Sequence, residues 1–332
     1  MRLDALFSDH MVLQARKPIR VFGEGAGRAS VCLDGDFADT ESSGPFWCAT
    51  LPARDEGGPY DLTVSLDGEE TVLRDVYVGD VYLLAGQSNM QFKLRESSCP
   101  EDQWVELPLL RGFSLARPEA GEPYAPEDGW QVCSRDKAGD FSAIGYHLGE
   151  MTRAGRAVGL IICYQGASVI ESWLPEGAAA SLGISVPLED RHVDHTWPEY
   201  TVWNQDGYLY RHMFRKLPPL SLSAVIWYQG ESDTTEAEAR VYDRELECLV
   251  RTWRGDLGDS SLPFVIVQIA DYQPRSDEGW RALQRAQQRA AAEIPFAALV
   301  RSADICESDN IHPATKSRLA ARIADVLKTL ST

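Results

Sequence analysis

The stretch VYLLAGQSNMQF, residues 81–92, decides how the central part of the chain is interpreted. Its first half is a continuous apolar run of the kind that forms a buried strand, and this run stops at Gly86. Gln87, Ser88 and Asn89 follow directly. Because chemistry in a parallel α/β sheet collects at the carboxyl ends of the strands, Ser88 is a candidate nucleophile. The alternative is structural, since Gly, Ser and Asn also form the ordinary turns that terminate strands.

Two different patterns flank this strand. Before it, from residue 19 to residue 78, short β-rich runs alternate with turn signals, which predicts a small antiparallel β-sandwich. After it, buried runs alternate with helical stretches, which predicts a mostly parallel sheet with helices on both faces. We therefore expect a β-sandwich domain over residues 1–75 and an α/β domain over residues 76–332.

The α/β part of the chain contains helical patterns and two segments without a period. Helices are expected near residues 142–153, 207–216, 237–253 and 280–292, with a final helix from Pro313. The segments 95–136 and 174–204 are interpreted as lids or binding walls, which long loops often form. In the second segment, Trp197, Tyr200 and Trp203 suit stacking on a sugar ring, and packing of the loop itself is the alternative.

Composition narrows the class of protein. The formal net charge of -18 over 332 residues opposes binding to nucleic acid, which normally requires a basic face. No apolar run is long enough to span a membrane and no export signal is evident, so we expect a cytoplasmic protein without membrane contact. The alternative is a secreted or periplasmic protein whose signal has been removed. The sequence does not indicate an oligomeric state.

Cysteine and histidine spacing argues against a metal site. The seven cysteines are scattered and never spaced as C-x-x-C, which argues against a zinc ribbon and a full disulfide framework and favours a reducing compartment. Cys32 and Cys48 remain candidates to face each other across the β domain. The sequence HVDH, from His192 to His195, has no third ligand at a fixed spacing, so we expect neither a metal nor an organic cofactor.

A second chemical signal lies near the carboxyl terminus, in the sequence SDNIHPATKSRL. Asp309 and His312 stand three residues apart, just before the predicted final helix. A histidine that acts as general base needs a partner that fixes its tautomer, and Asp309 can do so from the same short loop. Together with Ser88 these residues complete a Ser, His, Asp set. The alternative is that Asp309 caps the following turn and His312 is an incidental surface residue.

Two further strand ends offer donors for the oxyanion that forms during acyl transfer. The run GLIICYQGAS ends near Gly166, where a backbone N–H can approach a substrate, and AVIWYQGESD ends near Gln229, whose amide is a donor. A turn requirement at Gly166 and ordinary polarity at Gln229 are the structural alternatives. Four strand ends with matching roles favour the chemical interpretation.

These motifs resemble the signature blocks of sialate O-acetylesterases, within the SGNH hydrolase superfamily. The matching blocks are GQSNM at residues 86–90, WYQGE at residues 227–231 and IHP at residues 311–313, and the opening LFSDHMVLQ resembles the start of bacterial members. The resemblance implies an SGNH-hydrolase, flavodoxin-like, three-layer α/β/α domain. It departs from the family at Gln165, Gly166 and Ala167, where relatives usually have two glycines, which affects the shape of the acyl pocket.

The resemblance also implies roles for individual residues. Ser88 would be the nucleophile, His312 the general base and Asp309 its orienting acid. The backbone N–H groups of Ser88 and Gly166 and the side chain of Gln229 would form the oxyanion hole. Glu231 would be a possible supporting acid, and a buried glutamate bonded to loop backbone is the alternative.

The sequence therefore predicts a serine esterase that removes acetyl groups from an acetylated sugar, with O-acetylated sialic acid as the first candidate substrate. Acetylxylan, a neutral polysaccharide, is the alternative substrate. A non-catalytic carbohydrate-binding protein is the alternative from another class, and the complete Ser, His, Asp set argues against it.

Overall fold

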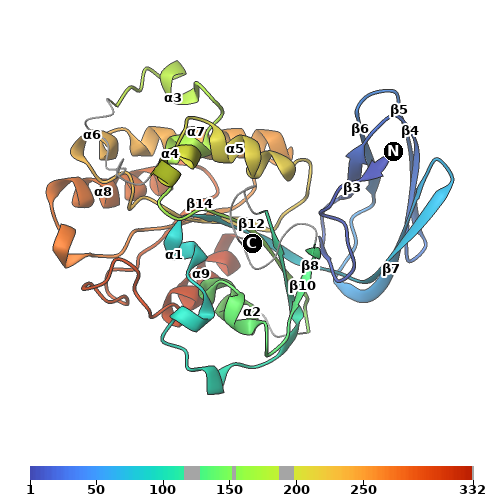
Figure 1. The fold of residues 1–332 in the computed structure, drawn as a ribbon, viewed down its shortest axis with the longest axis horizontal. Coiled ribbons are helices and arrows are strands. Elements are labelled where there is room, and N and C mark those ends of the chain that lie inside the picture. Colours follow the sequence, from blue (N-terminus) through green and yellow to red (C-terminus); the bar gives the residue numbers. More distant parts are fainter. Residues whose placement is uncertain (116–127, 152–154, 187–197, 331–332) are drawn as a thin grey trace.

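The protein is described by a computed structural model that covers residues 1–115, 128–151, 155–186 and 198–330. Figure 1 shows an all-β region next to a larger region in which helices lie on both sides of a sheet. The α/β class is confirmed, with a mixed sheet. Among these described residues, we find no helix with the length and apolar character that a membrane crossing requires.

The N-terminal β region, residues 1–78, contains two small sheets. One sheet has the strand order β1-β3-β6, and in the other β4 pairs with β5 and β7, and β7 pairs with β8. The strands are β1 (Arg2–Leu3), β2 (Val12–Gln14), β3 (Ile19–Glu24), β4 (Gly27–Leu33), β5 (Asp36–Ser42), β6 (Phe46–Leu51), β7 (Gly57–Leu66) and β8 (Glu69–Gly86). Buried side chains from both sheets, such as Val21 and Val31, belong to one hydrophobic core. Cys32 and Cys48 are both free thiols, so they do not form a disulfide.

The long strand β8 joins this region to the central sheet. Its first half pairs with β7, and its second half pairs in parallel with both β11 and β12. The domain boundary predicted at residue 75 therefore falls inside one continuous strand. Asp75 has a φ of 56°, so the backbone of β8 changes direction at this residue.

The central sheet has the order β10-β9-β11-β8-β12-β13-β14, and only the β10–β9 pair is antiparallel. The strands beyond β8 are β9 (Leu107–Ser114), β10 (Gln131–Cys133), β11 (Val158–Tyr164), β12 (Ala224–Tyr228), β13 (Phe264–Val267) and β14 (Ala297–Val300). Gly86 pairs with Tyr164 on one side and with Tyr228 on the other. The carboxyl ends of the three middle strands thus lie at the same edge of the sheet.

Alternate residues of β8 face two separate cores, as the two-residue period of a strand requires. Leu83 and Ala85 pack in the core that contains residues of α7 and α8, whereas Tyr82 and Leu84 pack in the core that contains residues of α2 and α9. The helices are α1 (Ser88–Gln91), α2 (Ala143–Met151), α3 (Ala178–Ser181), α4 (Pro198–Trp203), α5 (Tyr208–His212), α6 (Glu236–Ala239), α7 (Tyr242–Leu257), α8 (Glu278–Glu293) and α9 (Ser317–Leu330), with short 3-10 turns η1 (Leu94–Glu96), η2 (Glu101–Gln103), η4 (Ala138–Asp140), η5 (Ile170–Trp173), η7 (Phe214–Lys216) and η8 (Gln273–Arg275).

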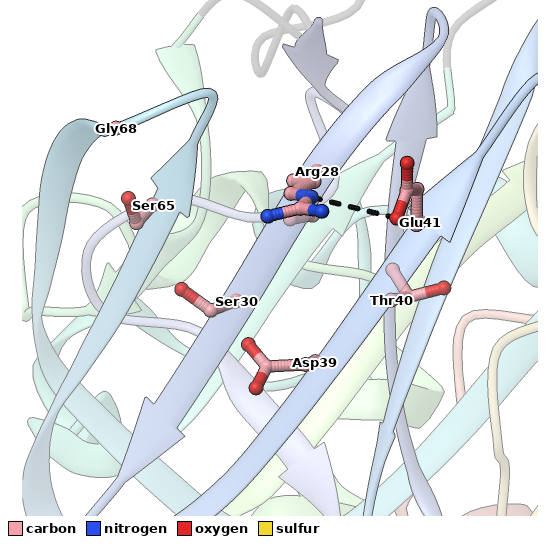
Figure 2. Close-up of a pocket in the computed structure, with 8 residues that line it drawn as sticks. Arg28, Ser30, Asp39, Thr40, Glu41, Ser65 and Gly68 are labelled. Atoms are coloured by element: carbon pink, nitrogen blue, oxygen red, sulfur yellow. Dashed lines mark ion pairs between the residues drawn. The ribbon is translucent and has the colours of Figure 1, made fainter.

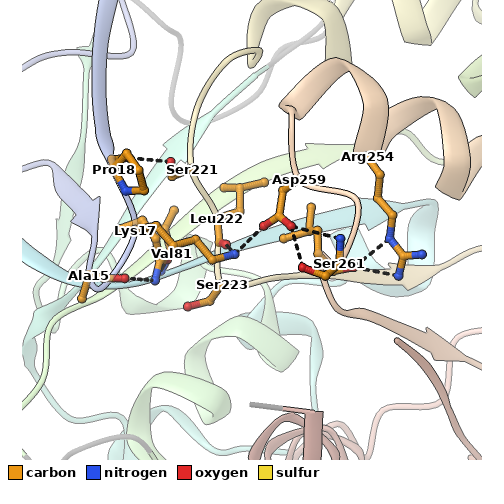
Figure 3. A network of polar contacts seen from close by, with 12 residues as sticks. Ala15, Lys17, Pro18, Val81, Ser221, Leu222, Ser223, Arg254, Asp259 and Ser261 are labelled. Carbon is orange, nitrogen blue, oxygen red and sulfur yellow. Dashed lines mark hydrogen bonds and ion pairs between the residues drawn. The ribbon is translucent and has the colours of Figure 1, made fainter. Parts of the chain in front are cut away.

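Polar contacts also join the N-terminal β region to the amino-terminal edge of the central sheet (Figure 3). Lys17 Nζ donates to the carbonyl oxygen of Leu222 and to the carboxylate of Asp259, both at 2.7 Å. The Ser221 hydroxyl donates to the carbonyl of Pro18 at 2.7 Å. Burial raises the pKa of Asp259, but hydrogen bonds and the charge of Lys17 bring it below its ordinary value.

The expectation for segment 95–136 was wrong in one respect. This segment supplies β9, a strand of the central sheet, and the short strand β10. The apolar run of β9 is interrupted by Arg111, whose buried guanidinium donates to the carbonyls of Asp75, at 2.8 Å, and Pro108, at 3.2 Å. Arg111 interrupts the continuous apolar run by which a buried strand is recognised in a sequence. Its burial depends on partners such as Asp75 that are distant in the sequence.

The final helix begins later than expected. Helix α9 starts at Ser317, whereas we expected it to start at Pro313. The residues between them serve a loop instead, because Ala314 accepts a backbone hydrogen bond from Ser98 at 3.0 Å and Thr315 N–H donates to Glu307 at 3.2 Å.

Candidate active site

Ser88 stands where the sequence motif predicts it, just past the end of a central strand. Gly86, the last residue of β8, has a φ of 128°, a conformation that favours glycine. A Cβ added to Gly86 would lie 2.1 Å from the carbonyl oxygen of Tyr228, so no larger residue fits. The chain turns here, and Ser88 becomes the first residue of the short helix α1.

His312 reaches Ser88 from the loop that follows β14. Its Nε2 lies 2.8 Å from Ser88 Oγ, which is hydrogen-bond distance. Within the loop, the backbone N–H of His312 donates to the Asn310 side chain at 2.9 Å. On the other side, the Phe92 ring stacks against the imidazole with ring centroids 6.1 Å apart. These contacts fix the position of the imidazole relative to the serine hydroxyl.

The electrostatic surroundings keep His312 neutral. Burial lowers the pKa of the imidazole below its ordinary value, the positive charge of Lys316 lowers it further, and the carboxylate of Glu96 raises it. A neutral imidazole has a free lone pair, so it can accept the proton of the serine hydroxyl near neutral pH.

Asp309 is not joined to His312 in the structure. The Asp309 side chain is exposed, and no hydrogen bond or ion pair between Asp309 and the imidazole occurs among the residues that the structure describes. The two residues share one short loop, as expected, but the assignment of Asp309 as the orienting acid stays a prediction.

Gly166 lies beside the nucleophile. A Cβ added to Gly166 would be 3.7 Å from Ser88 Cβ and 3.3 Å from Gln91 Oε1. Within the described ranges, neither the Ser88 N–H nor the Gly166 N–H has a protein acceptor. Both groups are therefore available as donors at the sheet edge.

The amide of Gln229 is engaged elsewhere. Its Nε2 donates to the Ser168 carbonyl at 2.7 Å and to the Asp233 carboxyl, and its Oε1 accepts from the Tyr242 hydroxyl at 2.8 Å. The side chain is fully buried, and both amide hydrogens are used by protein acceptors. The structure thus does not present Gln229 as a donor next to Ser88.

Glu231 belongs to a buried polar network behind the serine. Asn89 Nδ2 donates to Glu231 Oε1 at 2.6 Å and to the carbonyl of Ile311 at 2.9 Å. Lys316 Nζ donates to Asn89 Oδ1 at 2.7 Å. Burial raises the pKa of Glu231, against the lowering influence of Asn89 and Lys316. We call Asn89, Glu231 and Lys316 the buried triplet.

Sequence reasoning missed two members of the buried triplet. Asn89 stood in the quoted polar run without a role, and its place next to Ser88 was the available signal. Lys316 resembled a solvated residue at the start of the final helix. Its side chain is only 1% exposed, and nothing in the local sequence indicates this burial.

The described aromatic residues of segment 174–204 pack against the protein and do not form an exposed surface on which a sugar ring could stack. The Trp203 indole is buried, donates to the carbonyl of Gly166 at 3.1 Å and lies 5.2 Å from the Tyr200 ring centroid. Trp197 lies outside the described residues, as do His192 and His195. In the described ranges, no group of three or more His, Cys, Asp or Glu residues is arranged to hold a metal ion.

A separate pocket of about 450 Å³ lies on the N-terminal β region. Figure 2 shows it on the face of β4 and β5, where Arg28 and Glu41 form an ion pair at 3.4 Å. All its lining residues precede residue 69, so this pocket does not include Ser88 or His312.

Comparison with known proteins agrees with this geometry. Residues 78–328 match the family described as "Carbohydrate esterase, sialic acid-specific acetylesterase". The human sialate O-acetylesterase is 26% identical over 322 residues, which cover 83% of this chain and 59% of the human protein. The orangutan (Pongo abelii) sialate O-acetylesterase has the same identity and coverage. This chain thus spans about three fifths of the length of these relatives.

A solved structure is similar over nearly the whole chain. The carbohydrate acetylesterase from Xanthomonas citri is 31% identical, with a TM-score of 0.84, over 99% of this chain and 75% of that protein. The family match covers the region that holds Ser88, Gly166, Glu231 and His312. This chain therefore belongs to the sialic acid-specific acetylesterase family of carbohydrate esterases.

Proposed function

We propose that this chain is a serine esterase that removes O-acetyl groups from carbohydrate. The distance of 2.8 Å between Ser88 Oγ and His312 Nε2 carries the proposal, because a serine becomes nucleophilic when a neutral base accepts its proton. Family membership supports an acyl group bound to a sugar. We also assign the α/β region to the SGNH hydrolase fold and residues 1–75 to a β-sandwich domain.

The reaction follows from these two residues. Ser88 Oγ attacks the ester carbonyl carbon while His312 Nε2 takes the hydroxyl proton. The bond between the carbonyl carbon and the sugar oxygen then breaks, and His312 passes the proton to the departing sugar oxygen. A water molecule attacks the acetyl-serine with His312 again as base, which releases acetate and restores Ser88. These steps require no metal or organic cofactor.

The oxyanion is assigned first to the two free backbone donors. The N–H groups of Ser88 and Gly166 would stabilise the negative charge that develops on the carbonyl oxygen. Gln229 remains a third predicted donor, and this role requires its amide to leave Asp233 or Ser168. Asp309 is proposed to orient His312, which requires its carboxylate to turn towards the free Nδ1 when substrate is bound.

The choice between an anionic and a neutral sugar depends on the charges around His312. The family name favours O-acetylated sialic acid, whose carboxylate calls for a positive partner. Arg95, one of several basic residues that could serve, donates to the Gly139 carbonyl at 3.2 Å and forms an ion pair with Asp140. The nearby carboxylate of Glu96 opposes an anion. Lys316 adds a positive charge near the same imidazole, but its Nζ is already bonded to Asn89. Acetylxylan or another neutral sugar is therefore the second candidate substrate.

Replacement of the nucleophile tests the proposal. We expect Ser88→Ala to abolish hydrolysis of p-nitrophenyl acetate and of acetylated sugars, with little change in the melting temperature, because the hydroxyl adds little to the core. Ser97→Ala is a matched control, since the Ser97 hydroxyl has only local backbone partners: it donates to the Leu94 carbonyl at 2.7 Å and accepts from the Cys99 N–H at 3.2 Å. This variant should leave kcat/KM unchanged. Activity of Ser88→Ala equal to wild type would falsify the mechanism. Absence of activity in the wild type on all acetylated sugars would instead favour a binding protein.

A further inference from the structure

The Asn89 amide of the buried triplet connects the turn that carries Ser88 to the loop that carries His312. Asn89 directly follows Ser88, and its Nδ2 donates to the carbonyl of Ile311, the residue before His312. The other Nδ2 hydrogen goes to Glu231 Oε1, and Oδ1 accepts from Lys316. All hydrogen-bonding groups of the Asn89 amide except one lone pair are thus occupied.

Lys316 sets the orientation of this amide. An ammonium group has three donors and no acceptor, so it faces Oδ1 and forces Nδ2 towards Glu231 and Ile311. If the amide rotated by half a turn, the ammonium would face an N–H group and the Ile311 carbonyl would lose its donor. Because all three side chains of the buried triplet are at most 4% exposed, such mismatched contacts are costly.

Aromatic rings hold Lys316 in place. Its Nζ lies 4.9 Å from the Phe92 ring centroid and 5.6 Å from the Tyr228 ring centroid, within the range of cation–π attraction. The same Phe92 ring also stacks with the His312 imidazole, with ring centroids 6.1 Å apart. The Lys316 ammonium and the His312 imidazole therefore share one aromatic ring as a neighbour.

We propose that Lys316 is a positioning residue, which orients Asn89 so that the Ser88 turn and the His312 loop stay joined, and which places a positive charge in the surroundings of the His312 imidazole. This inference rests on the proposed esterase function. It adds a cation to the Ser, His, Asp set, and the cation acts through Asn89 and through space rather than by touching the substrate.

The charged groups around Lys316 determine how the site responds to pH. Glu231 after β12, Cys306 and Glu307 in the loop after β14, and His312 face it. Burial lowers the pKa of Lys316 to about 8, although Cys306, Glu231 and Glu307 raise it. Above this pH His312 is already neutral, so loss of the Lys316 charge acts there by weakening the hold on Asn89.

The profile of activity against pH should have an acid limb and an alkaline limb, and the protonation of His312 and Lys316 determines where each lies. Activity should rise from low pH as His312 loses its proton, at a midpoint below its ordinary value. Activity should fall as Lys316 loses its proton, at a midpoint near its own lowered value. Removal of the Lys316 charge should therefore move the first limb to higher pH and abolish the second.

The test is the pH profile of kcat/KM for p-nitrophenyl acetate in three variants. For Lys316→Met we expect kcat to fall at least tenfold with KM nearly unchanged, and the acid limb to move to higher pH. For Lys316→Arg we expect the acid limb at the wild-type position and no alkaline fall, because arginine does not titrate in this range. Circular dichroism and thermal melts check that each variant is folded.

Lys17→Met is the matched control. Lys17 is also partly buried and bonded to a carbonyl and a carboxylate, but at the amino-terminal edge of the sheet. We expect a lower melting temperature with both limbs unmoved. The proposal is overturned if folded Lys316→Met has its acid limb of kcat/KM at the wild-type pH. It is also overturned if the alkaline fall of kcat/KM persists in Lys316→Arg. This second result decides the question if Lys316→Met does not fold. Failure of the esterase proposal is distinguishable, since it would show as activity in Ser88→Ala.

Discussion

Ser88 and His312 are 224 residues apart in the sequence, and their side chains meet because two strand ends lie at one edge of the sheet. Neither residue type is informative by itself. Their pairing depends on contacts around them, above all on the Asn89 amide that bonds the His312 loop. Two carboxylates, Asp309 and Glu231, are candidates to support the imidazole.

Two substitutions separate the candidate acids. If Asp309 orients His312, Asp309→Asn should leave the fold intact and lower kcat by about a hundredfold or more, because an amide cannot offset the imidazolium charge. Glu231→Gln should act mainly through stability, with a loss of about 1 to 3 kcal/mol in the free energy of unfolding, because it disturbs a buried hydrogen bond. Urea denaturation and steady-state kinetics on the same preparations measure both effects.

The opposite pattern would reassign the acid. If kcat collapses in Glu231→Gln while Asp309→Asn stays nearly active, Glu231 acts through Asn89 and Asp309 is a loop residue. Equal losses in both variants would mean that the two carboxylates act as a coupled pair, and the double variant would then show a non-additive effect.

Among the elements, β8 and its terminal glycine control the geometry of the site. The sequence predicted this strand, its end at Gly86 and the serine beyond it, because a buried run followed by a turn residue is a local pattern. It did not predict β9, or the start of α9 at Ser317, because partners distant in the sequence decide those features: Asp75 for Arg111 in β9, and Ser98 for Ala314 before α9. The same reason explains why the Gln229 amide, predicted as a free donor, is instead bonded to Ser168 and Asp233.

Gly86→Ala tests the role of the strand end. A new Cβ would meet the Tyr228 carbonyl oxygen at 2.1 Å, and the φ of 128° is unfavourable for alanine. We expect a loss of about 3 kcal/mol or more in the free energy of unfolding, because strain and a steric clash add. Any folded fraction should also have reduced kcat, since Ser88 would move relative to His312.

Gly35→Ala is the matched control for the cost that a positive φ alone imposes on alanine. Gly35 has a φ of 90° in the N-terminal β region, but a Cβ there would meet nothing within 4 Å. This variant should lose only about 1 to 2 kcal/mol, the cost of the positive φ alone, and keep its kcat. Equal losses at both glycines in chemical denaturation would contradict the assigned clash with Tyr228.

At the scale of the whole molecule, the net charge of -18 bears on the substrate. Long-range repulsion opposes an anionic sugar, but salt at physiological strength screens charges beyond about 8 Å and leaves local groups in control. An enzyme that binds sialic acid by its carboxylate should lose affinity when salt screens the local positive partner. A neutral xylan fragment should be insensitive to salt.

Acetate release from 9-O-acetylated sialic acid and from acetylated xylo-oligosaccharide, at low and high salt, distinguishes these substrates. From the family we expect activity on the sialic acid, with a KM that rises as salt increases. Ser88→Ala serves as the control for background hydrolysis of each substrate. Release from xylan fragments alone, unaffected by salt, would replace the sialate assignment with the neutral one favoured by Glu96 and by the pairing of Arg95 with Asp140.

The continuity of β8 has a consequence for how this protein can be divided. Its amino-terminal half completes a sheet of the N-terminal β region, and its carboxyl-terminal half carries the backbone to Ser88. A cut at the predicted boundary would leave one half-strand without its covalent continuation on each side. The N-terminal region is therefore not an exchangeable module attached by a tether, and grafting it between relatives would require a splice within a single strand, in register on both sides.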